Sequence, residues 1–182
     1  MKYSFVTDTH WFAPNAINTV FVEKNDILLG DIYDLRNCKK SKVPQILSLI
    51  EQMRNYALYL QDNHDAINGK VSDPQLIPNT KIAICGGSQI FWDEDRLHDY
   101  TNKEFGAGFL KRQIWVRALM LASKFVSDKI SDNAMSRAVD IAKKLGASIV
   151  VCGHKHPNKI LTRIHNGVTL YVLPRGKTVI DL

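Results

Sequence analysis

The sequence lacks the features that mark a disulfide-bonded, repetitive or membrane-spanning protein. Only three of its 182 residues are cysteines, an odd number without disulfide-like spacing, which favours reduced thiols in the cytoplasm. No apolar run approaches the ~20 residues of a transmembrane segment, and no signal-like segment opens the chain. Repeats and low-complexity stretches are absent as well. We therefore expect a single cytoplasmic domain over residues 1–182.

Neither sign of charge is in large excess. The chain has 24 Lys and Arg against 18 Asp and Glu, a formal net charge of +6. This charge favours anionic partners such as a phosphorylated small molecule, a lipid-linked substrate or nucleic acid. Because no basic run is interleaved with aromatic residues, nucleic acid is the weaker expectation.

Polar residues follow four short apolar runs, each of which is typical of a buried strand. The runs are residues 3–6, 27–29, 56–60 and 148–151, and the residues that follow them are Asp8 and His10, Asp31, residues 63–65, and His154 and His156. In α/β sheets, ligands gather outside the carboxyl ends of strands. Four of the six histidines lie in these motifs, which predicts a metal or catalytic site there.

The remaining chain alternates between helix and strand signals. Pro44 opens a predicted helix, residues 81–85 form another strand, and residues 17–22 fit either helix or strand. Residues 109–126 and 131–145 are predicted helices, the second capped by Ser131 and ended by Gly146. Residues 160–164 and 168–173 are predicted to form a hairpin around Asn166 and Gly167.

The strand-end side chains suit a two-metal centre. Two divalent ions roughly 3.5–4 Å apart can clamp a phosphate and activate water for in-line displacement. Carboxylates, imidazoles and amide oxygens without a required thiolate favour Mn²⁺, Fe, Zn²⁺ or Co²⁺ over Ca²⁺.

The order of the motifs resembles that of the calcineurin-like metallophosphoesterases. It reads Asp-x-His, Gly-Asp-x-x-Asp, Asn-His-Asp and Gly-His-x-His, and spans residues 8–156. The resemblance implies an α/β fold, a four-layer α/β/β/α sandwich with the site at the strand ends. A helical insert would occupy about residues 92–145, before the last motif.

The resemblance also implies a role for each motif residue. Asp8, His10 and His156 would bind a first divalent ion, Asn63 and His154 a second, and Asp31 both. Mn²⁺ is the first expectation for both ions, with Fe, Zn²⁺ or Co²⁺ as alternatives. His64 would contact the phosphate and protonate the leaving group, while Asp65 would orient His64.

Two departures from the family pattern concern the second ion. Asp62 stands where the third motif normally has glycine, and the fourth motif's histidine is missing. Gly86 is the nearest equivalent of that histidine, with Cys85 as the other choice. The second ion would then be weak or absent, or completed by water or by an insert residue such as Asp93, Glu94 or His98.

The expected activity is hydrolysis of a phosphodiester or pyrophosphate bond. Leu35 and Asp65 stand where Ser/Thr phosphatases of this fold carry Arg and Glu, a pattern nearer the phosphodiesterase and pyrophosphatase branches. Among these, the UDP-2,3-diacylglucosamine diphosphatases also carry a helical insert. The alternative is a non-catalytic phosphate- or nucleotide-binding protein with a degraded metal site.

The insert offers candidate substrate contacts. Arg96, Arg112 and Arg117 could reach a phosphate, although a solvated position is the default for each. The apolar helix over residues 109–126 either packs broadly on the core or caps the site. As a cap it would hold an apolar part of the substrate or a second protomer of a homodimer.

Overall fold

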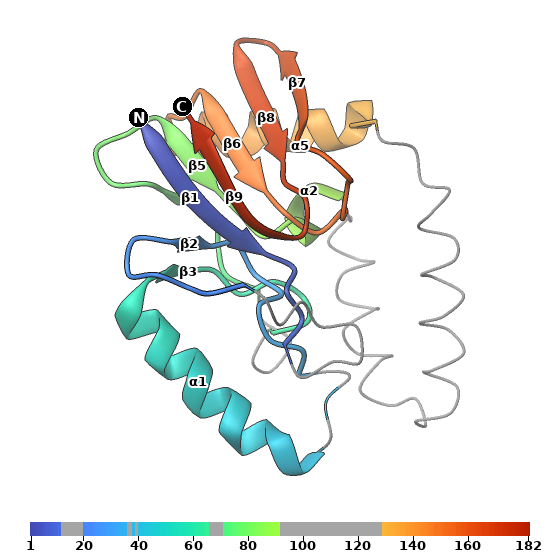
Figure 1. The fold of residues 1–182 in the computed structure, drawn as a ribbon. Coiled ribbons are helices and arrows are strands. Elements are labelled where there is room, and N and C mark those ends of the chain that lie inside the picture. The colour runs from blue at the N-terminus through green and yellow to red at the C-terminus, as the bar shows by residue number, and fades with distance from the viewer. Residues whose placement is uncertain (12–19, 36–37, 39, 66–70, 92–128) are drawn as a thin grey trace, which may run out of the picture.

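A computed structural model describes residues 1–11, 20–35, 38, 40–65, 71–91 and 129–182 (Figure 1). Arg96, Arg112, Arg117, the candidate ligands at 93, 94 and 98, and the predicted helix over 109–126 all lie outside these residues. Among the described residues, no helix is both long and apolar enough to cross a membrane.

The first sheet has four strands in the order β3-β2-β1-β9. Their bounds are β1 (Lys2–Thr7), β2 (Ile27–Leu28), β3 (Leu58–Tyr59) and β9 (Gly176–Asp181). β1, β2 and β3 run parallel, so their carboxyl ends meet at one edge of the sheet. β9 pairs antiparallel with β1 along its whole length, from Lys2 opposite Asp181 to Thr7 opposite Gly176.

The second sheet has five strands in the order β4-β5-β6-β8-β7. Their bounds are β4 (Gln75–Leu76), β5 (Ile82–Ile84), β6 (Ile149–Cys152), β7 (Leu161–His165) and β8 (Val168–Val172). β5, β6 and β8 are parallel, while β4 and β7 run antiparallel at the two edges. The predicted hairpin is confirmed, since Asn166 and Gly167 both take positive φ in the turn between β7 and β8.

The helices are α1 (Val43–Tyr56), α2 (Ser88–Phe91) and α5 (Asp132–Leu145), with a 3-10 turn, η1 (Lys40–Lys42), before α1. Pro44 lies in the first turn of α1, as predicted. The Ser131 side chain accepts a hydrogen bond from the Ala134 amide, and Gly146 ends α5 with φ of 68°. These two caps confirm the predicted bounds of α5.

Three apolar clusters hold four layers together, because successive strand residues point to opposite faces. Phe5 of β1 packs between the two sheets with Ile84 and Val151. Its neighbour Val6 faces the other way, in the cluster that includes Ile46 of α1.

On the outer face of the second sheet, Val150 lies in one cluster with Met135 and Ala138 of α5. Figure 1 shows α1 and α5 on opposite sides of the pair of sheets. The chain is therefore an α/β/β/α sandwich, as predicted.

Three details differ from the sequence predictions. Tyr56 is the last residue of α1 rather than the start of a strand, and β3 begins only at Leu58. β4 and β9 were not predicted. In β9 only Gly176 and Ile180 are buried, because this edge strand exposes much of its length to solvent and shows little hydrophobic signal.

Candidate metal centre

The predicted site residues converge where parallel strands of both sheets end. Asp8 and His10 follow β1, Asp31 follows β2, and the turn at residues 62–65 follows β3. His154 and His156 follow β6 in the second sheet. Within the described residues, three groups of ligand atoms lie close enough to hold a metal ion, each group within 4.8 Å. The first group is Asp8, His10 and His156, the second is Asp31, Asp62 and His154, and the third is His10, Asp34 and His64.

The first group is the ligand set expected for the first ion. His156 Nε2 lies 3.0 Å from Asp8 Oδ1, and the ring centroids of His10 and His156 are 5.5 Å apart. The His154 amide donates to Asp8 Oδ2 over 2.8 Å, and the Thr7 hydroxyl donates to the same oxygen. These bonds tie the ends of β1 and β6 together across the two sheets.

Electrostatics leave this group in the form that binds cations. Burial alone would raise the pKa of Asp8, but the nearby His156 and His10 outweigh it and hold that pKa below its usual range. Burial lowers the pKa of His10 to about 4. At neutral pH the site therefore offers a carboxylate and a neutral imidazole, which are the forms that ligate metal.

The second group joins Asp31 and His154, both predicted ligands, with Asp62. His154 Nδ1 lies 3.9 Å from Asp31 Oδ2 and 3.6 Å from Asp62 Oδ2. Asp31 Oδ1 also accepts a 2.7 Å hydrogen bond from the His64 amide. Burial raises the pKa of Asp31 well above its usual value, with Asp62 and Asp65 nearby adding to the rise. A cation between these carboxylates would relieve that repulsion.

Asp34 lies between two of the histidines. Its Oδ2 is 3.3 Å from His64 Nδ1 and 3.5 Å from His10 Nδ1. Burial opposes ionisation of Asp34, but His64 and His10 outweigh it and hold its pKa well below the usual range. A buried carboxylate beside Nδ1 fixes the orientation of each ring.

Asp65 has a different position from the one expected. Its carboxylate accepts hydrogen bonds from the Tyr59 hydroxyl, the Asp62 amide (2.7 Å) and the Ile32 amide (3.0 Å). Burial raises the pKa of Asp65 to about 7. The structure thus gives Asp34 as the carboxylate beside the His64 ring, while Asp65 holds the turn after β3 against the end of β2. The second Asp of Gly-Asp-x-x-Asp was the sequence signal for this role.

The backbone at the strand ends is strained. Seven non-glycine residues among those described have positive φ, and five of them are predicted ligands. These five are Asp8, His10, Asp31, His154 and His156, with φ between 49° and 77°. Each such residue costs on the order of 1–3 kcal/mol, which persists only where the surroundings enforce it, typically at functional sites. The other two, Asn79 and Asn166, lie in turns, where this conformation is common for Asn.

Two buried ligand atoms fit a cation. Asn63 Oδ1 and His10 Nε2 are buried without a hydrogen-bond partner in the part of the chain that the structure describes. Both residues are at least 97% buried, so leaving such atoms unpaired is costly. Lone pairs of this kind are what a metal ion would engage, and the donor set of carboxylate, imidazole and amide oxygen suits one.

Of the two residues considered for the missing histidine, Cys85 faces away from the site. It is fully buried in the apolar cluster beneath α5 together with Cys152, and both are free cysteines. Gly86 instead faces Asp62, because a Cβ built on Gly86 would lie 2.9 Å from the Asp62 carboxylate carbon. Gly86 is thus the residue in line with the second group of ligands.

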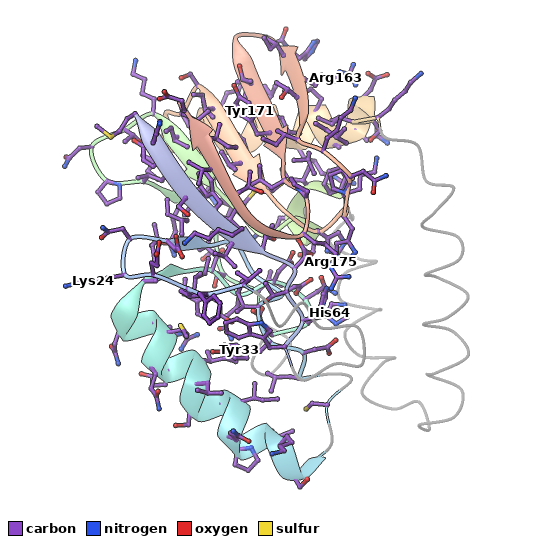
Figure 2. All side chains as sticks on the ribbon, in the orientation of Figure 1. Lys24, Tyr33, His64, Arg163, Tyr171 and Arg175 are labelled. Carbon is purple, nitrogen blue, oxygen red and sulfur yellow. The ribbon has the colours of Figure 1, made fainter. Side chains whose placement is uncertain are left out.

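A cation that the sequence did not single out lies next to the site. Arg175, in the loop before β9, donates from Nε to the Asp8 carbonyl over 2.9 Å. Figure 2 shows Arg175 and His64 at the same end of the sandwich. A guanidinium beside a metal centre is suited to bind phosphate oxygens.

No protein-family model matches the chain, and no curated protein sequence matches it significantly. Its fold is similar to the structure of Vacuolar Protein Sorting 29 from Cryptosporidium parvum, with a TM-score of 0.47 and 11% identity over 96% of this chain and 74% of that one. It is also similar to the solution NMR structure of the Thermotoga maritima protein TM1076, with a TM-score of 0.46 and 15% identity over 100% and 91% of the two chains.

Proposed function

We propose that this chain is a metal-dependent phosphohydrolase of the calcineurin-like metallophosphoesterase type. The observation that carries the proposal is the convergence of carboxylates and imidazoles, several on strained backbone, at the carboxyl ends of strands from both sheets. A structural role alone does not account for five such residues in the left-handed conformation at one edge.

The residues divide into two ligand sets. Asp8, His10 and His156, whose ligand atoms lie together, would hold one divalent ion. His154 and Asp31, which share another group, would hold the other with Asn63, whose Oδ1 is buried without a hydrogen-bond partner among the described residues. As the resemblance implies, Asp31 would contact both ions. When bound, such ions polarise the phosphate, supply an activated water at neutral pH and neutralise developing charge.

The chain's own acid is His64. Its ring is about one-fifth exposed, so it can meet a substrate, and Asp34 stabilises the imidazolium. An imidazolium in this position can give its proton to the leaving oxygen as the P–O bond breaks. Arg175 adds a fixed positive charge near Asp8 for the phosphate oxygens.

We further propose a phosphodiester or pyrophosphate as the bond that is cleaved, as the sequence pattern at Leu35 and Asp65 favours. The missing histidine at the end of β5 favours the alternative, a degraded and non-catalytic site. This argument is weaker because Asp62 lies in the second group of ligand atoms.

The direct test is hydrolysis by the EDTA-treated chain after addition of Mn²⁺. We expect turnover of an aryl phosphodiester and of a nucleoside diphosphate ester, with less turnover of an aryl monophosphate. His64→Ala should keep bound metal and lose most rate on esters with a poor leaving group, since those need the proton most. A folded chain that binds no metal, or binds metal and hydrolyses none of these esters with Mn²⁺, Fe²⁺, Zn²⁺ or Co²⁺, would refute the proposal.

A further inference from the structure

Asp62 fits into a slot formed by two glycines. A Cβ on Gly86 would lie 2.9 Å from both Cγ and Oδ1 of Asp62, and a Cβ on Gly30 would lie 2.4 Å from Asp62 Cβ. Real Cβ atoms essentially never approach this closely. Gly30 also has φ of 92°, so neither its backbone nor its surroundings admit a side chain. The carboxylate of Asp62 therefore occupies the space that a side chain at position 86 would need.

The two departures from the family pattern are thus complementary in space. The resemblance leads one to expect glycine at position 62 and histidine at position 86, and this chain has Asp62 and Gly86. We propose that Asp62 supplies to the second ion the ligand that a histidine at the end of β5 would otherwise supply. This inference rests on the proposed function, because it concerns a residue of the same metal centre.

The position of Asp62 supports a ligand role. It is 1% exposed, its Oδ2 lies 3.6 Å from His154 Nδ1, and it forms one ligand group with His154 and Asp31. The neighbouring Asn63 brings a buried amide oxygen without a hydrogen-bond partner among the described residues. An ion held between these groups would have three oxygen-bearing ligands and one imidazole. Such a set favours a harder ion, Mn²⁺ or Mg²⁺, over Zn²⁺ at this position.

The competing explanation is that Asp62 only holds a turn. Its Oδ2 accepts a 3.1 Å hydrogen bond from the Ser88 amide, and its Oδ1 accepts one from the Ser88 hydroxyl, at the start of α2. The two roles are compatible, since an ionised carboxylate has about four lone-pair sites. The experiment must therefore separate the charge of Asp62 from its hydrogen bonds.

Asp62→Asn makes that separation. The amide keeps the shape and one acceptor oxygen, and it can donate to the Ser88 hydroxyl, but it carries no charge to offer a cation. Calorimetric titration of the EDTA-treated chain with Mn²⁺ should give two ions for the parent and one for Asp62→Asn. We expect the second Kd to rise at least about 100-fold, the upper end of what losing an outer hydrogen-bond partner of a ligand costs. The melting temperature in EDTA should stay near that of the parent.

Ser88→Ala is the matched control. It removes the hydroxyl next to Asp62 but leaves the carboxylate, so it should still bind two ions. A second test moves the ligand between the strand ends: Gly86→His alone should clash with Asp62, whereas Asp62→Gly combined with Gly86→His should restore the second ion. If Asp62→Asn binds both ions with parental affinity, or if Ser88→Ala loses the second ion as completely, Asp62 holds a turn and is not a ligand.

A measurement on the unaltered chain decides the matter if these variants do not fold. Anomalous diffraction from crystals grown with Mn²⁺ should show an ion within coordination distance of an Asp62 oxygen. Two ions without Asp62 as a ligand would overturn this inference and leave the proposed function standing. An unaltered chain that binds no ion in the titration would overturn both.

Discussion

Replacing the buried Asp8 or Asp31 by Asn should shift the melting temperature of the metal-free chain in opposite directions. Burial raises the pKa of Asp31 above its ordinary value of 3.8, so its ionised form destabilises the fold. The pKa of Asp8 is held below that value by His156 and His10 despite burial, so its ionised form stabilises the fold. In EDTA at neutral pH, Asp31→Asn should raise the melting temperature and Asp8→Asn should lower it.

The size of the Asp8 effect follows from its contacts. The carboxylate accepts from the Thr7 hydroxyl, the His154 amide and His156 Nε2, whereas an amide accepts through one oxygen only. Leaving one buried partner unsatisfied costs about 1–3 kcal/mol. For a chain of 182 residues, each kcal/mol shifts the melting temperature by about 2–4 °C, so a fall of about 2–12 °C is expected.

The pH dependence has a definite sign for each variant. A folded-state pKa raised above 3.8 costs stability progressively as pH rises, so the gain from Asp31→Asn should be absent below about pH 4 and grow above it. A lowered pKa contributes stability above about pH 4, so the loss from Asp8→Asn should shrink as pH falls below that value.

With Mn²⁺ bound, the parent should melt at a higher temperature than Asp31→Asn, the reverse of their order in EDTA. At free Mn²⁺ about 100 times Kd, one bound ion adds about 2.7 kcal/mol, or roughly 5–11 °C for this length. The parent should gain this much and Asp31→Asn should gain little, because a contact to both ions is lost. Differential scanning calorimetry with EDTA and with Mn²⁺ measures both effects. A fall for Asp31→Asn in EDTA, or an equal gain with Mn²⁺, would refute the reasoning.

Three further predictions test single contacts. Asp34→Asn should lower turnover of a poor-leaving-group ester by about 100-fold or more at saturating Mn²⁺, because His64 loses its neighbouring carboxylate, and Mn²⁺ titration should show weaker binding, because Asp34 also orients His10. Tyr59→Phe should cost about 1–3 kcal/mol in urea unfolding, since its hydroxyl donates to buried Asp65. Ser131→Ala should cost about 1 kcal/mol through loss of the α5 cap and leave the Mn²⁺ titration unchanged; a much larger loss would mean that Ser131 has another role.

The resemblance predicted the four layers, and apolar runs predicted most of the strands; the burial of side chains within those strands explains the layers. Alternation in pairs such as Phe5 and Val6 sends one side chain between the sheets and the next toward α1. Likewise, Ser131 and Gly146 mark the ends of α5 through local backbone chemistry. The sequence did not predict β9, because its pairing with β1 joins opposite ends of the chain and buries little apolar surface.

The residues that gather at the candidate site could be predicted as a set, but the contacts between them could not. Motif order places Asp8, His10 and His156 together, and the structure confirms that their ligand atoms lie within 4.8 Å. Which carboxylate faces which imidazole depends on side-chain direction at left-handed strand ends. Asp34, three residues after Asp31 in the Gly-Asp-x-x-Asp motif, lies beside the His64 ring. The sequence prediction gave this role to Asp65, the residue that follows His64, but Asp65 instead accepts from the Ile32 amide.

Asp62 and Gly86 show why departures from a motif should be judged in pairs. Taken one at a time, an added carboxylate is an anomaly and a missing histidine is a loss of function. In the folded chain, a Cβ on Gly86 would lie 2.9 Å from the Asp62 carboxylate, so glycine at position 86 leaves room for Asp62. Because the ends of β3 and β5 belong to different sheets, neither spacing nor periodicity along the chain could reveal this contact. On the proposal above, the ligand lies at the end of β3 instead of the end of β5, and the metal centre keeps its place in the fold while gaining one negative charge.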